Sequence, residues 1–302
     1  MKLHALGEDR LLAQLLPKFA SRKNIIAGAG DDCAVVAAPG GGNLLLLKTD
    51  CVVEGIHFET GADAVAIGWK ALARPLSDFA AMAGVPQFAL VTMIVPSVRE
   101  VAWVKKIYRG LQKAADKFNV AIVGGETSST FGPAVISVSV TGFVEKKRWV
   151  SRAGGKSGDE LFVTGCLGGS RSGRHLQFVP RIEEARWLTR HFPIRAMIDL
   201  SDGLGVDLPR LARASKLGFD ADEDALPRTR GCTIEQANND GEDYELLFAI
   251  SRDRSTALQR AWRKQFPRLM LTRIGRLNPK SNPPQADQNP KWSGYVHFTE
   301  RR

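Results

Sequence analysis

The stretch GAGDDCAVV, residues 28–36, places two adjacent aspartates, Asp31 and Asp32, between a glycine turn and an apolar run that predicts a strand. Neighbouring carboxylates repel each other, and burying them without partners is costly. The pair therefore needs a cation or hydrogen-bond donors, which other parts of the chain or a bound ion have to supply.

Acidic residues recur beside strand ends and turns, although the chain is basic overall, with a formal net charge of +10. Besides the pair at 31–32, they are Asp50 after LLLLKT, Asp78 in a predicted helix, Glu126 after IVGG, and Asp199 and Asp202 in IDLSDG. If these carboxylates converge on one place, they need cations. Mg²⁺ is the natural partner, because it prefers oxygen ligands and bridges carboxylates to phosphates. For any one residue alone, capping of a turn or helix is an equally good interpretation.

The local sequence leaves two interpretations open for three of these residues. On a helical wheel, Asp78 lies opposite the apolar stripe, on a face with Ala71 and Arg74 that lacks the charges of a solvated helix. A metal site and an ordinary helix surface explain this face equally well. Asp199 and Asp202 would lie near a helix N-terminus, where backbone N–H groups bind phosphate. A doubly capped helix start is the alternative.

The order of the predicted elements indicates two domains of α/β or α+β architecture. A chain of 302 residues suggests two domains at roughly 150 residues each. A charged, glycine-rich segment follows Glu145, so we predict an N-terminal domain over 1–145 and a C-terminal domain over 146–302. Strands are expected at 43–53, 87–96, 120–128, 134–145, the start of 160–169, 243–251 and 269–277, and helices at 1–20, 64–84, 97–118 and 182–192. Residues 278–291 predict a loop, and the aromatic segment 292–298 is expected to dock on the body.

Composition excludes several classes of protein. No apolar run approaches the ~18 residues of a membrane helix, and the first residues lack the apolar core of a secretion signal. The four cysteines are scattered, which favours free thiols in the cytoplasm. Basic residues are spread along the chain without an aromatic-basic module, so we expect no nucleic-acid partner. The positive charge would instead steer anionic substrates.

Familiar catalytic and nucleotide-binding motifs are absent. GGKSGD, residues 154–159, is not a Walker A loop, because Val150 stands where its first glycine belongs. Cys33 stands where the third glycine of a dinucleotide fingerprint belongs. No serine elbow or Cys–His pair stands out, and His57 is a lone histidine of the kind that is more often structural than catalytic.

Taken in order, the motifs resemble the thiamine-monophosphate kinase family. The matching blocks are GAGDDCAVV, KTDCVVEGIHF, GWKALARPLSDFAAMAGVP, IVGGET, SRAGGKSGDELFVTGCLG, AMIDLSDGLGVDL, DGEDYELLF and WSGYVHF. Single blocks are weak evidence, but the ordered set spans nearly the whole chain and is highly specific. The resemblance implies the two-domain fold of aminoimidazole ribonucleotide synthetase, in which the N-terminal α/β domain forms the dimer sheet and the C-terminal domain is α+β.

The resemblance also implies a reaction and the residues that perform it. The γ-phosphoryl group of ATP would pass to thiamine monophosphate, giving thiamine diphosphate, with several Mg²⁺ ions bound to a cytoplasmic homodimer. The implied positions are Asp32, Thr49, Asp50, Asp78, Glu126, Asp199 and Asp202 for metal, Asp50, Arg152 and Asp202 for catalysis, Gly125, Glu126, Arg152 and Ser201 for ATP, and His57, Glu242 and Tyr295 for thiamine monophosphate.

Departures from the family pattern leave a second interpretation open. Lys48 replaces the small hydroxyl residue that usually precedes Thr49, and a cation there would displace a metal. Glu126 stands for an aspartate, Asp240 stands for a glycine, and the segment before Ala196 is shorter than in the family. These departures favour, as the alternative, a catalytically weakened ATP-binding paralogue or another ATP-using enzyme of the same superfamily.

Overall fold

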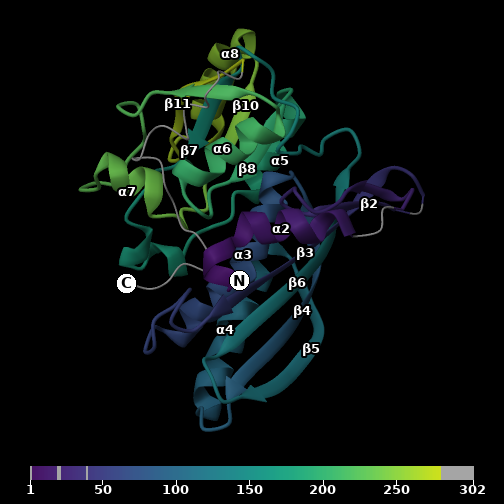
Figure 1. The fold of residues 1–302 in the computed structure, drawn as a ribbon, viewed down its shortest axis with the longest axis vertical. Coiled ribbons are helices and arrows are strands. Elements are labelled where there is room, and N and C mark those ends of the chain that lie inside the picture. Colours follow the sequence, from purple (N-terminus) through teal and green to yellow (C-terminus); the bar gives the residue numbers. More distant parts are fainter. Residues whose placement is uncertain (1, 19–21, 39, 280–302) are drawn as a thin grey trace.

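The chain folds into two α/β halves that follow one another along the long axis of the molecule (Figure 1). The computed structural model describes residues 2–18, 22–38 and 40–279. A six-stranded sheet lies in the N-terminal half and a five-stranded sheet in the C-terminal half, which confirms the predicted class of fold. The predicted loop beyond Pro279 and the docking of residues 292–298 lie outside the described residues.

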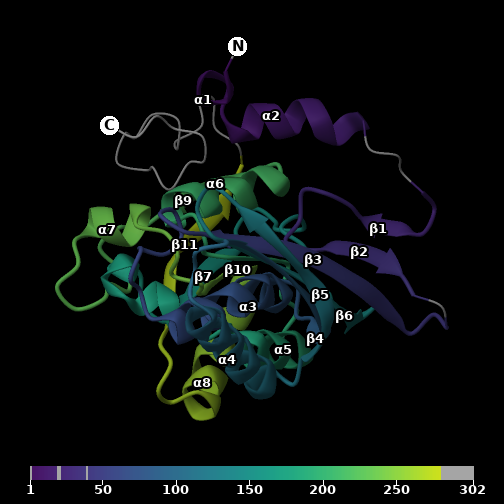
Figure 2. The same cartoon turned by 90° about the horizontal axis from the view of Figure 1, so that it is seen from below.

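In the N-terminal sheet, β4 and β5 are parallel and all other neighbouring strands are antiparallel. Its strands, in spatial order, are β1 (Ile25–Ala27), β2 (Ala34–Ala37), β3 (Asn43–Val53), β6 (Val135–Glu145), β4 (Val85–Pro96) and β5 (Ala121–Thr130). Helices α3 (Ala64–Ala81) and α4 (Val101–Phe118) cover one face (Figure 2). Because side chains alternate along a strand, Leu44 and Leu46 of β3 are buried, whereas Leu47 is exposed on the open face.

Helix α3 is enclosed by the sheet, by α4 and by the C-terminal half. Asp63 caps its N-terminus by accepting hydrogen bonds from the amides of Val65 and Ala66 at 3.3 and 3.2 Å. Gly68 lets α3 approach α4 closely, because a Cβ atom there would collide with the carbonyl oxygen of Ile107. Polar side chains on α3 are therefore held within the protein rather than in solvent.

The C-terminal sheet is fully antiparallel and has a hydrophobic core on each face. Its strands, in spatial order, are β8 (Ala196–Asp199), β10 (Leu246–Ile250), β7 (Glu160–Thr164), β11 (Leu271–Asn278) and β9 (Gly218–Ala221). The helices of this half are α5 (Ile182–His191), α6 (Leu204–Ala214), α7 (Ile234–Asn239) and α8 (Arg252–Gln265), and two 3₁₀ turns, η2 (Ser170–Ser172) and η3 (Arg174–Leu176), precede them. On β10, Leu247 joins the core beneath α6, and Phe248 joins the core beneath α5 and α8. Burial on both faces explains the unbroken apolar run of this strand.

Some element boundaries differ from the predictions. Helix α4 begins at Val101 rather than Ser97, because residues 97–99 form a turn in which the Arg99 amide donates to the Pro96 carbonyl at 2.9 Å. The single helix expected at 1–20 is divided at Gly7, whose φ of +76° is not helical. The pieces are α1 (Leu3–Leu6), α2 (Glu8–Leu15) and the 3₁₀ turn η1 (Leu16–Lys18). The sequence did not predict β1, β8, β9 or α7.

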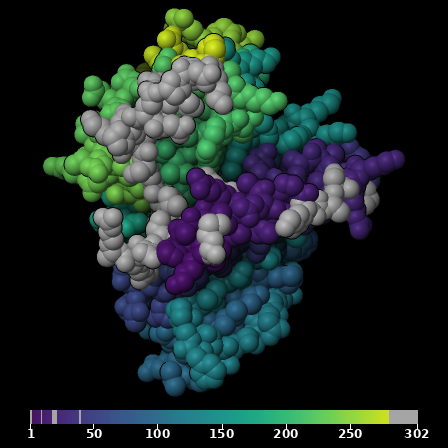
Figure 3. Space-filling model, viewed as in Figure 1, coloured from purple at the N-terminus to yellow at the C-terminus, as the bar shows by residue number. Residues whose placement is uncertain are grey.

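The surface view shows α1 and α2, in purple, where the green C-terminal half meets the blue and teal N-terminal half (Figure 3). Within the ranges given above, the structure contains no helix with both the length and the apolar character needed to span a bilayer.

The two halves are joined by polar contacts around the C-terminal end of α3. The Ser77 hydroxyl donates to Asp199 Oδ2 at 2.6 Å, linking α3 to the end of β8. Arg186 of α5 donates to the Ala83 carbonyl at 3.2 Å and to Glu145 at 2.9 Å. Three of the predicted acidic residues, Asp32, Asp78 and Asp199, converge at this junction.

Candidate active site

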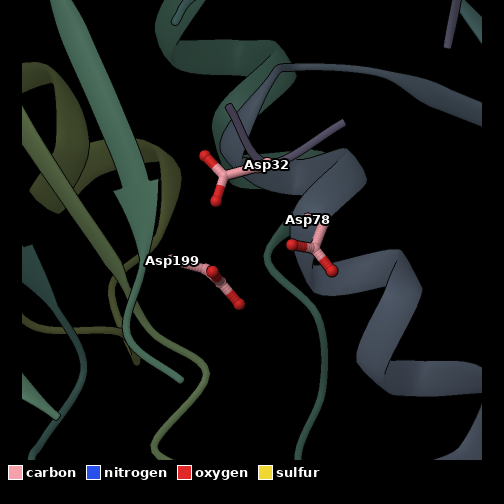
Figure 4. Close-up of side chains that lie close together, drawn as sticks. All are labelled: Asp32, Asp78 and Asp199. Atoms are coloured by element: carbon pink, nitrogen blue, oxygen red, sulfur yellow. The ribbon is translucent and has the colours of Figure 1, made fainter. Parts of the chain in front are cut away.

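Three buried carboxylates from three separate segments meet at the junction. Asp32 precedes β2, Asp78 lies near the end of α3, and Asp199 ends β8. Each offers one carboxylate oxygen, and these oxygens lie within 4.8 Å of one another. Figure 4 shows the three side chains reaching a common space from separate parts of the chain. We call this group the acidic cluster.

The adjacent aspartates of GAGDDCAVV share one partner, Arg152. The Arg152 amide donates to Asp31 Oδ1 at 3.0 Å, and its guanidinium donates to Asp32 Oδ1 through Nη2 at 2.6 Å and Nε at 3.2 Å. The other carboxylate oxygen of Asp32 is buried and has no hydrogen-bond partner among the described residues. One arginine therefore makes the paired placement tolerable and leaves an acceptor free inside the cluster.

The electrostatics of the cluster suit a divalent cation. Burial raises the pKa of Asp78 well above its usual value, with Lys48 opposing the rise and Asp50 adding to it. Burial and the charge of Asp32 raise the pKa of Asp199 to about 7. A cation among these oxygens would favour their charged forms, and the free Asp32 oxygen completes a set of hard donors. The residues present therefore fit Mg²⁺.

Lys48 places an ammonium group directly beside this cluster. Its Nζ lies 2.7 Å from Asp78 Oδ1 and 3.9 Å from Asp50 Oδ2. Burial opposes the charge, but the two carboxylates together raise the pKa of Lys48 above its usual value. The ammonium is thus charged at neutral pH and balances part of the negative charge at the predicted metal site.

The alternation of β3 separates Thr49 from Asp50. Asp50 lies on the same face as Lys48, beside the cluster. Thr49 lies on the open face of the sheet, where its hydroxyl accepts a hydrogen bond from Ser139 at 3.1 Å. Of these two adjacent predicted metal ligands, only Asp50 is near the acidic cluster.

Asp202 lies in the loop between β8 and α6, outside the group of three carboxylates. Its carboxylate pairs with Arg210, and its amide donates to Asp207 Oδ2 at 3.0 Å. Asp207 is itself buried. Its burial is the main cause that raises its pKa well above the usual value, and the negative charge of Asp202 adds to the rise. The sequence analysis missed Asp207 and Arg210, although their spacing of three residues at a helix start was a detectable signal.

Gly125 and Glu126 lie on β5, at the edge of the N-terminal sheet. The strand order places β5 three strands away from β3. A Cβ atom at position 125 would collide with the Val91 carbonyl oxygen, so the close approach of β4 requires glycine there. Glu126 is exposed, and in the described chain it does not take part in the acidic cluster.

A second group of polar residues surrounds the ammonium of Lys70 on α3. Lys70 Nζ donates to the His57 carbonyl and to Glu242 Oε1, each at 2.6 Å, and its side chain is 0% exposed. Burial lowers the pKa of Lys70 to about 8, although Glu242 opposes the shift. The structure thus brings together two predicted thiamine monophosphate positions, while Tyr295 lies outside the described residues. Lys70 was not among the predicted site residues, because its role depends on contacts with segments far away in the sequence.

The segment that carries Glu242 has an unusual backbone. Glu242 and Tyr244 have φ angles of +54° and +53°, in the left-handed region that non-glycine residues rarely adopt. The Glu242 amide donates to the Ser201 carbonyl at 2.7 Å, so the predicted ATP residue Ser201 lies beside this segment. Asp240 accepts a hydrogen bond from the Gly169 amide at 2.7 Å. The backbone is thus fixed next to the acidic cluster.

Comparisons with known proteins show the family and the fold of the chain. Residues 30–144 match the model of the AIR synthase related protein, N-terminal domain, and residues 144–263 match that of the C-terminal domain. The chain is 35% identical over 288 residues to thiamine-monophosphate kinase of Rhodopirellula baltica, covering 89% of each protein. It is 31% identical to thiamine-monophosphate kinase of Aquifex aeolicus, covering 99% of this chain and 100% of that one.

A solved structure extends the similarity to three dimensions. AaThiL complexed with AMPPCP and TMP has a TM-score of 0.84 with this chain at 31% identity, over 99% of each chain. The similarity in sequence and in fold covers both halves and the junction between them. The chain belongs to the thiamine-monophosphate kinase family of AIR synthase related proteins.

Proposed function

We propose that this chain transfers the γ-phosphoryl group of ATP directly to thiamine monophosphate, giving thiamine diphosphate. The observation that carries the proposal is the convergence of Asp32, Asp78 and Asp199 from both halves of the chain. Relatives named thiamine-monophosphate kinase and the similarity to AaThiL with AMPPCP and TMP support this choice of reaction. Phosphoryl transfer depends on positioning and charge neutralisation, which such a junction supplies.

In this proposal the acidic cluster holds Mg²⁺, with Asp50 beside it. Bound Mg²⁺ would neutralise the charge of the ATP phosphates. The Arg152 guanidinium, which donates to Asp32, is proposed also to bind a phosphate of ATP. Ser201 and the Asp202 loop lie close to the same junction and are proposed to position the nucleotide. His57 and Glu242 are proposed to orient the acceptor, whose phosphate needs no strong general base.

We also propose that the protein is a homodimer formed through the open face of the N-terminal sheet. Leu47, Phe88 and Leu90 are 37, 48 and 50% exposed on that face. The strand registers place Leu47 in one row with Phe88 and Thr49 in one row with Leu90. Grouped apolar side chains of this kind mark an interface. Glu126 lies on the same face, so the proposed metal roles of Thr49 and Glu126 depend on the dimer.

The remaining assignments are proposals of the same kind. The domain division after Glu145 is supported by the end of β6 there and the start of the second sheet at Glu160. A cytoplasmic location is supported by the four free cysteines. For the dimer, Leu90→Asp should convert the protein to monomers in analytical ultracentrifugation, and an unchanged sedimentation coefficient would reject this interface.

Incubation of the purified protein with ATP, Mg²⁺ and thiamine monophosphate tests the function. We expect thiamine diphosphate and ADP in equal amounts by chromatography, and none from Asp32→Asn. The exposed surface variant Lys113→Met serves as the control and should retain activity, since Lys113 lies on the outer face of α4. A folded wild-type protein that forms no thiamine diphosphate would reject the proposal.

A catalytically weakened ATP-binding protein is the second candidate, and the contact between Lys48 and Asp78 favours it. An ammonium in this position competes with a divalent ion for the same carboxylate oxygens. Calorimetry distinguishes the two candidates. Binding of a non-hydrolysable ATP analogue without turnover of thiamine monophosphate would support the weakened protein, whereas turnover by the same preparation would exclude it.

A further inference from the structure

Three charged residues lie on one face of α3 at four-residue spacing. They are Lys70, Arg74 and Asp78. Residues four apart on a helix lie one above the other, about 6 Å apart along the axis. Lys70 is bound to Glu242 at one end of this row, and Asp78 belongs to the acidic cluster at the other end. Arg74 therefore lies between the proposed acceptor site and the proposed metal site.

Arg74 is held in place by the main chain rather than by a carboxylate. Its Nη1 donates to the Cys51 carbonyl at 2.7 Å. Its Nε is buried and has no hydrogen-bond partner among the described residues. A buried donor of this kind is uncommon in folded proteins and calls for an explanation. An acceptor group that enters the site when a ligand binds would satisfy it.

Three other cations near the site have carboxylate partners. Lys48 pairs with Asp78, Lys70 with Glu242, and Arg152 with Asp32. Among the described residues, Arg74 forms no such ion pair. Burial opposes the charge of Arg74, but nearby carboxylates, among them Asp50, Glu242 and Asp78, raise its pKa above the usual value. Its guanidinium is thus surrounded by site residues and remains available for an anion.

We propose that Arg74 binds the phosphate of thiamine monophosphate and aligns it with the γ-phosphoryl group of ATP. This inference deepens the proposed function and rests on it. The planar guanidinium matches the oxygens of a phosphate and can donate to two of them. An oxygen of the acceptor phosphate forms the new bond to the γ-phosphorus, the bond from that phosphorus to the β–γ bridging oxygen breaks, and ADP leaves with the electron pair. Arg74 is a positioning residue that offsets the charge repulsion between the two phosphates.

Binding measurements on Arg74→Met separate this role from a structural one. By calorimetry, we expect R74M to bind thiamine monophosphate roughly 10- to 100-fold more weakly than the wild type, the loss typical of a charge-assisted contact. Binding of unphosphorylated thiamine should be unchanged, because thiamine lacks the group that Arg74 would hold. Affinity for the ATP analogue AMPPCP with Mg²⁺ should change much less. R74K should recover part of the affinity for thiamine monophosphate.

Arg109→Met is the matched control, because Arg109 is exposed on α4, away from this row. Arg74→Gln keeps a donor for the Cys51 carbonyl and replaces R74M as the test variant if R74M unfolds. The inference is overturned if the wild type forms thiamine diphosphate while the Arg74 variant binds thiamine monophosphate as the wild type does. Equal weakening for thiamine and thiamine monophosphate also overturns it. A wild type that forms no thiamine diphosphate instead rejects the proposed function, so the two failures are distinguishable.

Discussion

Replacement of Lys48 by methionine tests whether its ammonium balances the charge of the acidic cluster. Methionine preserves most of the apolar stem and removes the charge that lies 2.7 Å from Asp78. Removal of one partner costs about 3–5 kcal/mol for a buried ion pair and about 0–1 kcal/mol for an exposed pair. The two side chains are 22% and 10% exposed. We therefore expect Lys48→Met to lower the unfolding free energy by about 2–3 kcal/mol in the metal-free protein.

Addition of Mg²⁺ should reverse most of this loss. An ion present at about 100 times its dissociation constant stabilises the folded state by about 2.7 kcal/mol, which is close to the contribution removed with Lys48. The increase in unfolding free energy on addition of Mg²⁺ should be larger in Lys48→Met than in the wild type, because the lysine ammonium no longer competes with the ion for Asp78. The wild-type protein, Lys48→Met and the exposed control Lys113→Met are compared by urea unfolding, with chelator and with excess Mg²⁺.

Two results would refute this reasoning. One is a Lys48→Met protein that is as stable as the wild type in chelator. The other is a loss of stability that Mg²⁺ does not change, which would show that methionine disrupts packing rather than charge balance.

Three further predictions concern α3, two on Lys70 and one on Gly68. Burial lowers the pKa of Lys70 to about 8, so the ammonium that holds Glu242 loses its proton as the pH rises through 8. The kcat/KM for thiamine monophosphate should therefore fall above pH 8 in the wild type. Lys70→Met should show no such fall. A wild-type kcat/KM that stays constant up to pH 9.5, roughly 1.5 pH units above the pKa, would contradict this prediction. In the unfolded chain Lys70 keeps its proton up to about pH 10.5, so between pH 8 and 10.5 the unfolded state binds more protons than the folded state. The unfolding free energy of the wild type, compared with that of Lys70→Met by urea unfolding, should therefore rise over this pH range. Gly68→Ala should lower the unfolding free energy by roughly 1–3 kcal/mol, because its Cβ atom would collide with the Ile107 carbonyl of α4. Ala71→Gly, the comparison variant on the same helix, should lower it by only about 1 kcal/mol. Equal shifts in the melting temperature of the two variants would argue against close packing of α3 and α4.

The residues that sequence reasoning identified correctly are those whose local pattern restricts them. Asp32 lies between a glycine turn and an apolar run that predicts a strand, so the sequence could place it at a strand end, whereas Asp199 was expected near a helix N-terminus and ends strand β8 instead. The helical wheel placed Asp78 opposite the apolar stripe, on a face that lacks the charge density of a solvated helix, and Asp78 is indeed buried there. The interior strand β10 was predictable from its unbroken apolar run, which is buried on both faces of the sheet.

The residues that sequence reasoning missed are defined by contacts across the fold. A lysine or arginine within a helix is usually solvated, so the sequence does not reveal that Lys70 lies beneath residues 57 and 242. The pairing of Lys48 with Asp78 depends on how β3 packs against α3. Ser97 has the chemistry of a helix cap, but the turn after Pro96 delays the helix to Val101. Short polar elements such as β9 and α7 lack the periodicity that sequence reasoning requires.

Titration with Mn²⁺, followed by the electron paramagnetic resonance of the free ion, tests most directly whether the acidic cluster forms one site for a metal and a nucleotide. The wild type, Asp199→Asn and the exposed control Asp253→Asn, whose side chain is 71% exposed, are titrated with and without AMPPCP. We predict that the wild type and Asp253→Asn bind Mn²⁺ more tightly when AMPPCP is present, and that folded Asp199→Asn loses both the metal and this dependence on the nucleotide. Binding of Mn²⁺ by Asp199→Asn with the wild-type number of ions, affinity and response to AMPPCP would contradict the account.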